Sequence, residues 1–176
     1  MRQVMVRQGR FLVVLAALVC AVGLGAGVAS AQSPHFISAS VTCSSSTGDL
    51  LFSWKEAGLG SNQNITYELG ASNATVTCTC VTKSGNCPSA ANKVTASAPA
   101  LRAETLSSGK NGSITARNQV VTPPSCPASK SPTCGGGQVL MLSAVSYTGI
   151  HLTDTTNGID AGVSPTSCDF TFFSCP

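Results

Sequence analysis

The sequence has little charge and few aromatic side chains: 10% of its 176 residues are charged and 5% are aromatic. It contains one Trp, two Tyr and two His. Zinc sites use histidines or closely paired cysteines, and sugar-binding surfaces present aromatic faces, so both kinds of site are disfavoured. No segment of a dozen residues shows the apolar stripe of an amphipathic helix, and this absence points away from helical folds.

The N-terminal segment, residues 1–31, has the three parts of a secretory signal peptide. Three arginines in the first ten residues precede the apolar run FLVVLAALVCAVGLGAGVA, and ASA at residues 29–31 fits the small-x-small cleavage rule. The sequence therefore predicts a secreted protein that begins at Gln32 and has no membrane association after cleavage. The alternative is an uncleaved anchor, since the apolar run is nearly long enough to span a bilayer.

Removal of this segment changes the charge balance. The precursor has ten Lys and Arg against seven Asp and Glu, and three of the basic residues leave with the signal, so the remaining chain is neutral. Nucleic-acid binding requires basic residues gathered on one face, whereas the seven that remain are scattered along the chain, and we exclude it. A surface of near-zero net charge favours self-association or contact with the cell envelope.

Cysteine is unusually frequent in this chain. Eight cysteines follow the signal, and an even number in an exported chain predicts four disulfides, for which 105 pairings exist. Cys78 and Cys80 are two residues apart in an expected strand, so both face the same side and form separate bridges. The oxidising export route disfavours a metal site or a catalytic thiol. The eight are Cys43, Cys78, Cys80, Cys87, Cys126, Cys134, Cys168 and Cys175.

Apolar and polar residues alternate in short segments separated by Gly- and Pro-rich connections, as in half-buried strands. In one such segment Leu50, Phe52 and Trp54 share a face. The alternation predicts a single-domain antiparallel β-sandwich over residues 32–176, immunoglobulin-like in architecture and tied by disulfides, with a closed barrel as the alternative. A Pro- and Cys-rich loop is expected at about 122–137. The expected strands are 35–43, 49–57, 64–69, 74–81, 93–98, 100–106, 113–121, 138–147, 150–153 and 169–173.

Candidate catalytic residues are few. His151 and Asp154 could form a triad with one of the many serines, but no G-x-S-x-G nucleophile elbow is present. Glu56, Glu68 and Glu104 alternate with polar neighbours, and we expect them to face solvent rather than to form a carboxylate pair for glycoside hydrolysis. The sequence thus predicts a protein that is not an enzyme, with a hydrolase as the less favoured class.

The stretch DTTNGID is an oxygen-rich loop that resembles a cation site. Asp154, Asn157 and Asp160 are hard ligands of the kind that calcium uses. The spacing lacks the full EF-hand pattern, and Asn-Gly between apolar segments is a strong hairpin signal. We therefore expect a turn here, with calcium as the alternative, and no cofactor.

Four motifs carry a resemblance to a known group: KEAGLG at residues 55–60, SAANK at 89–93, SSGKNG at 107–112 and LTDTTNG at 152–158. With them, the chain resembles a group of small secreted proteins from high-GC Gram-positive bacteria, over nearly its whole mature length. The group has no assigned activity. The resemblance implies a bridge between Cys80 and Cys134, and a further hypothesis pairs Cys87 with Cys126.

Two functions follow as hypotheses. The first is a secreted, non-enzymatic extracellular or cell-envelope module with a structural or interaction role. The alternative is a carbohydrate- or small-ligand-binding domain, which is weakened because Trp54 is in phase with Leu50 and Phe52 and is therefore expected in the core.

Overall fold

The computed structural model of the chain describes residues 33–88, 92–127 and 134–175. These residues belong to one compact unit. The predicted signal peptide at residues 1–31 lies outside the described residues, as does part of the predicted loop at about 122–137. Within the described part of the chain, no helix has the length and apolar character needed to cross a membrane.

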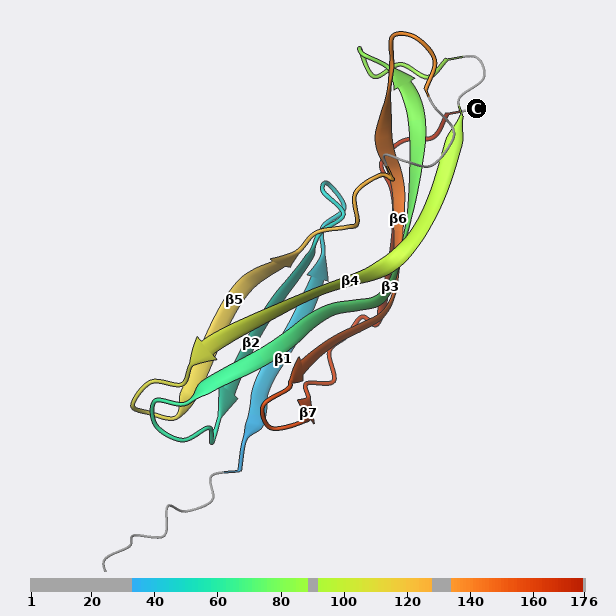
Figure 1. The fold of residues 1–176 in the computed structure, drawn as a ribbon. Helices are drawn as coiled ribbons and strands as arrows, with labels where there is room; N and C mark the ends of the chain where they lie inside the picture. Colours follow the sequence, from blue (N-terminus) through green and yellow to red (C-terminus); the bar gives the residue numbers. More distant parts are fainter. Residues whose placement is uncertain (1–32, 89–91, 128–133, 176) are drawn as a thin grey trace, which may run out of the picture. The chain divides into compact units, whose positions relative to one another are not determined.

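The described residues form eight strands in two antiparallel sheets that do not close into a barrel, and this confirms the predicted all-β sandwich. One sheet contains β1, β2 and β5, and the other contains β4, β3, β6 and β7, with β8 also paired to β6 (Figure 1). The bounds are β1 His35–Cys43, β2 Leu50–Ala57, β3 Asn64–Thr82, β4 Lys93–Ser107, β5 Ser113–Val121, β6 Gln138–Asp154, β7 Ile159–Asp160 and β8 Ser167–Thr171.

The strand order fits an immunoglobulin-like sandwich. Strands β1, β2 and β5 occupy the places of strands A, B and E, and β3, β6 and β7 those of C, F and G. The fourth strand, β4, pairs with β3 and so extends the second sheet, as the added strand C′ does in variable-type domains.

The core lies between the sheets and is built from the alternate residues of each strand. In β2, Leu50, Phe52 and Trp54 are all buried, so the predicted core position of Trp54 is confirmed. Both tyrosines are also fully buried, and the hydroxyl of Tyr147 donates a hydrogen bond to the carbonyl oxygen of Gly48 at 2.8 Å. The Trp and both Tyr are therefore inside the core and unavailable as surface platforms.

Three pairs of expected strands are continuous in the structure. Strand β3 runs through residues 70–73 with a register shift between Ala71 and Ala74, where a break was expected. Strand β4 likewise runs through Pro99, which it tolerates because β4 is paired on one side only. Strand β6 continues through Gly149, which has a φ of 66°. Glycine and proline here mark irregularities within long strands rather than turns between short ones.

Four disulfides join the described elements, as the even cysteine count predicted. Cys43 at the end of β1 is bonded to Cys168 in β8, so this bridge connects the two sheets. Cys78 and Cys80 of β3 have separate partners, Cys126 and Cys134. The second of these is the bridge that the resemblance implied. Four disulfides indicate an oxidising compartment outside the cytoplasm.

The hypothesis that Cys87 pairs with Cys126 is wrong. Cys126, on the segment after β5, reaches the buried side chain of Cys78. Cys87 follows β3 and is bonded instead to Cys175 near the C-terminus. The ammonium group of Lys93 holds the same C-terminal segment, because it donates a hydrogen bond to the Cys175 carbonyl oxygen at 2.8 Å.

Candidate functional site

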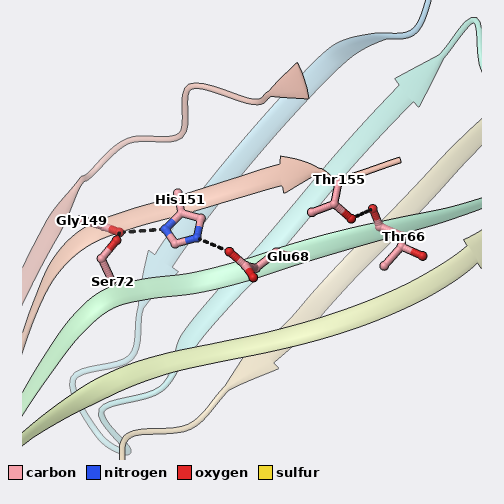
Figure 2. Close-up of polar contacts among 6 residues, drawn as sticks. All are labelled: Thr66, Glu68, Ser72, Gly149, His151 and Thr155. Atoms are coloured by element: carbon pink, nitrogen blue, oxygen red, sulfur yellow. Dashed lines mark hydrogen bonds and ion pairs between the residues drawn. The ribbon is translucent and has the colours of Figure 1, made fainter. Parts of the chain in front are cut away.

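His151 of β6 forms the centre of a polar cluster on the outer face of the second sheet (Figure 2). Its Nε2 lies 3.2 Å from Oε1 of Glu68 on the neighbouring strand β3, and its Nδ1 lies 2.9 Å from the carbonyl oxygen of Gly149. The side chains of His151 and Glu68 are 22% and 46% exposed. Solvent therefore reaches the pair, and such exposed pairs contribute little stability, typically about 0.2–1 kcal/mol.

A shallow hollow of about 570 Å³ opens beside this pair. Its lining includes the polar side chains of Glu68, His151 and Ser72 and the apolar side chains of Pro99 and Leu101 of the edge strand β4. The side chain of Leu101 is 47% exposed and so offers apolar surface to this hollow. A hollow with one apolar wall and one ionisable pair could contact a small polar ligand, but its openness provides little enclosure.

The triad considered for His151 is not formed. His151 and Asp154 are three residues apart in one strand, so they face opposite sides of the sheet, and Asp154 is fully buried. The nearby hydroxyl of Ser72 donates a hydrogen bond to the Gly149 carbonyl oxygen at 3.3 Å. Both ring nitrogens of His151 are occupied by Glu68 and Gly149, so neither is directed at a serine.

The segment proposed as a calcium alternative is a turn between β6 and β7. Oδ1 of Asp154 accepts hydrogen bonds from the backbone N–H groups of Thr156 at 2.9 Å and Asn157 at 3.0 Å. Oδ2 of Asp154 accepts a third from the Asn157 side-chain amide at 2.6 Å. Asp160 instead accepts from the N–H of Gly162 at 2.7 Å. Both carboxylate oxygens of Asp154 and one of Asp160 are thus engaged by the backbone and side chains of this segment, and no metal-ligand cluster occurs among the residues described.

This arrangement makes a testable prediction about calcium. Melting temperatures measured in excess calcium and in EDTA, at equal ionic strength, are expected to agree within experimental error, because a ligand stabilises a fold only if it binds the native state. A magnesium sample serves as the control for a general effect of divalent ions. A rise of several degrees with calcium alone would contradict the turn and restore the calcium site.

Glu56 is the main error of the sequence prediction. It was expected to face solvent, but it is completely buried in β2. Its Oε2 accepts a hydrogen bond from the Tyr67 hydroxyl at 2.7 Å, while no hydrogen-bond donor reaches Oε1 within the described structure. Burial raises the pKa of Glu56 to about 7. The nearby Asp154 carboxylate also raises this pKa, while the hydrogen bond from Tyr67 lowers it. Burial and the same hydrogen bond raise the pKa of Tyr67.

The other two glutamates lie on opposite faces of the second sheet. Glu68 lies on the outer face, whereas the expectation that Glu104 faces solvent is wrong, because Glu104 is paired with the buried Tyr67 and shares its inner face. Glu68 is half-exposed, as expected. Glu104 is 17% exposed at its side chain, and its Oε2 lies 3.1 Å from Nη2 of Arg102 on the same strand. Neither lies against Glu56 so as to form a catalytic carboxylate pair; the partner of Glu56 is Asp154.

The sequence did contain a signal for the buried position of Glu56. Leu50, Phe52, Trp54 and Glu56 are spaced two residues apart, so all four point to the same side of β2. The prediction gave more weight to the charge of Glu56 than to its position in this alternation. Asp154 could have been found in the same way, since it continues the buried positions Ile150 and Leu152 of β6.

Comparison with known proteins adds no identification: no family model, no curated protein and no solved structure matches this chain.

Proposed function

We propose that the protein is a secreted extracellular or cell-envelope module that acts through structure or interaction rather than catalysis. The main support is the arrangement of its four disulfides. One connects the two sheets, and the others attach β3 and the turn that follows it to segments distant in sequence. Bridges of this kind stabilise small exported domains outside the cell, where reductants do not open them.

The outer face of the second sheet supports an interaction role. Its hydroxyls are paired across strands β3 and β4: Thr66 with Thr105 at 3.0 Å, and Thr75 with Ser97 at 2.8 Å. This surface is polar but uncharged along these rows. Together with a net charge of zero after the signal, it presents no electrostatic barrier to a second copy or to an uncharged wall polymer.

The alternative, a small-ligand or carbohydrate-binding domain, has one specific observation in its favour. The hollow beside His151 joins an ion pair to the exposed side chain of Leu101. Against it, the aromatic residues best suited to stack on sugars, Trp54, Tyr67 and Tyr147, are all in the core.

One experiment distinguishes these functions. The protein without residues 1–31 is melted in the presence of a panel of glycans and cell-envelope polymers, and its sedimentation is measured across a range of concentrations. We expect concentration-dependent self-association and no shift with soluble sugars. A sugar that raises the melting temperature of the unmodified protein, but not that of a Leu101→Ser, His151→Ala variant, would instead establish the hollow as a binding site.

A further inference from the structure

Three polar side chains from both sheets meet in the core at one end of the sandwich. Glu56 comes from β2 of the first sheet, while Tyr67 of β3 and Asp154 of β6 come from the second. Each of the three is completely buried. The nearby indole of Trp54, whose ring centroid lies 4.8 Å from that of Tyr67, has its Nε1 buried without a hydrogen-bond partner among the described residues.

The charge of this cluster follows from its hydrogen-bond donors. The Asp154 carboxylate accepts three N–H hydrogen bonds from the turn that follows it, so both of its oxygens already have donors. The Tyr67 hydroxyl donates to Oε2 of Glu56, but Oε1 receives no donor. The ionisable groups that act on Glu56 are Tyr67 from β3, Asp154 from β6 and His35 from β1.

These contacts are compatible with only one negative charge. Tyr67, whose hydroxyl donates to Glu56, is paired in register with Asp154, and this brings the two carboxylates to the same part of the core. Two charged carboxylates there would repel each other and would both lose hydration. A proton on Glu56 removes this repulsion. It also places a hydrogen on the carboxyl group whose Oε1 atom receives no hydrogen bond from the described residues. The Asp154 carboxylate keeps its three hydrogen bonds to the turn in this arrangement.

We propose that Glu56 and Asp154 form a buried proton-binding site that fastens the two sheets together when it holds one proton and loosens this end of the sandwich when the proton is released. The site is distinct from the His151 hollow, since Asp154 and His151 face opposite sides of β6. It gives the domain a pH response that does not depend on the proposed function.

The direction of the response follows from proton linkage. The folded protein retains the Glu56 proton up to about pH 7, whereas the unfolded chain loses it near the ordinary value of 4.5. Where the folded state binds more protons, stability falls as the pH rises. The contribution is therefore complete below pH 4.5 and lost as the pH approaches 7, and the unfolding equilibrium constant is expected to increase roughly a hundredfold across this range.

The test compares urea unfolding at several pH values for the unmodified protein, Glu56→Gln and the surface variant Asp169→Asn, which removes an exposed carboxyl group of β8. We expect the unmodified protein and Asp169→Asn to lose stability together between pH 4.5 and 7, and Glu56→Gln to lose about a hundredfold less, since an amide cannot ionise. Equal pH dependence in all three proteins would overturn the proposal.

Two measurements on the unmodified protein keep the test decisive if Glu56→Gln does not fold. The infrared carbonyl band of a protonated carboxylic acid should persist at pH 6 and vanish above neutral pH. Over the same range, amide hydrogen exchange should accelerate in the turn at Thr155–Gly158 more than in the disulfide-bonded end of β3. Absence of the acid band at pH 6 would overturn the proposal, as would exchange that accelerates uniformly.

Discussion

On complete reduction, the fluorescence of the single tryptophan is expected to shift to that of an indole in water. Trp54 is 2% exposed in the folded domain, so its emission reports on the core. Removal of one native disulfide from a small secreted domain typically costs about 2–5 kcal/mol, and whole domains are stable by only about 5–15 kcal/mol. Loss of all four bridges is therefore expected to unfold the domain at room temperature.

A graded version of this experiment isolates the bridge between the sheets. Cys43 and Cys168 are 125 residues apart, and the loop-entropy estimate for this separation is about 5 kcal/mol. The double variant Cys43→Ala, Cys168→Ala is expected to lose stability by about that amount in urea unfolding. For the reduction experiment, the control is the oxidised protein treated with the alkylating reagent alone. If the reduced protein keeps its native tryptophan emission after all eight thiols have been titrated, the core does not depend on the bridges.

The substitution Gly70→Ala is expected to lower the free energy of unfolding by about 2–5 kcal/mol, from backbone strain and overpacking together. Gly70 lies in the middle of β3, paired with Leu101 of β4 and His151 of β6, and has a φ of 146°. A Cβ atom at this position would overlap the backbone carbonyl oxygen of Ala100. The alanine variant must therefore displace β4, which is an edge strand held on this side by β3 alone.

Two further glycines separate the causes of this effect. Gly85 also has a positive φ, of 84°, but no atom lies within 4 Å of its Cβ position, so Gly85→Ala measures conformational strain alone. Gly136→Ala should be nearly neutral, because Gly136 has neither a positive φ nor a close neighbour. If Gly70→Ala and Gly85→Ala cost the same, the close approach of β4 at Ala100 is not the reason for glycine.

The strands could be predicted because alternation is a local property. The two-residue spacing of Leu50, Phe52 and Trp54 is enough to show that they lie on the same side of the sheet. Strand continuity was less accessible: Gly70, Pro99 and Gly149 resemble turn residues in the sequence, and only pairing with neighbouring strands shows that the chain passes through them without turning. The number of strands was therefore overestimated while their positions were nearly correct.

The candidate sites were harder to predict because they depend on contacts between distant strands. The partner of Cys87 is Cys175, 88 residues away, and no spacing rule selects it from the possible pairings. The ion pair of His151 with Glu68 depends on the register of β3 against β6. Glu56 differs from these, since its phase in β2 was visible, and the prediction failed by assuming that a charged residue must face solvent.

The bridge between Cys43 and Cys168 also determines how the domain would bear mechanical tension. A force applied at Ser33 and Cys175 would pass along β1 to Cys43, cross the bridge and leave through the C-terminal segment. Strands β2 to β7 lie outside this path. Only residues 33–43 and 168–175 could be drawn out, by no more than about 65 Å, whereas the same chain without bridges could extend to roughly 500 Å. Under load the domain would act as a short tether, and the strands outside this path would carry no tension.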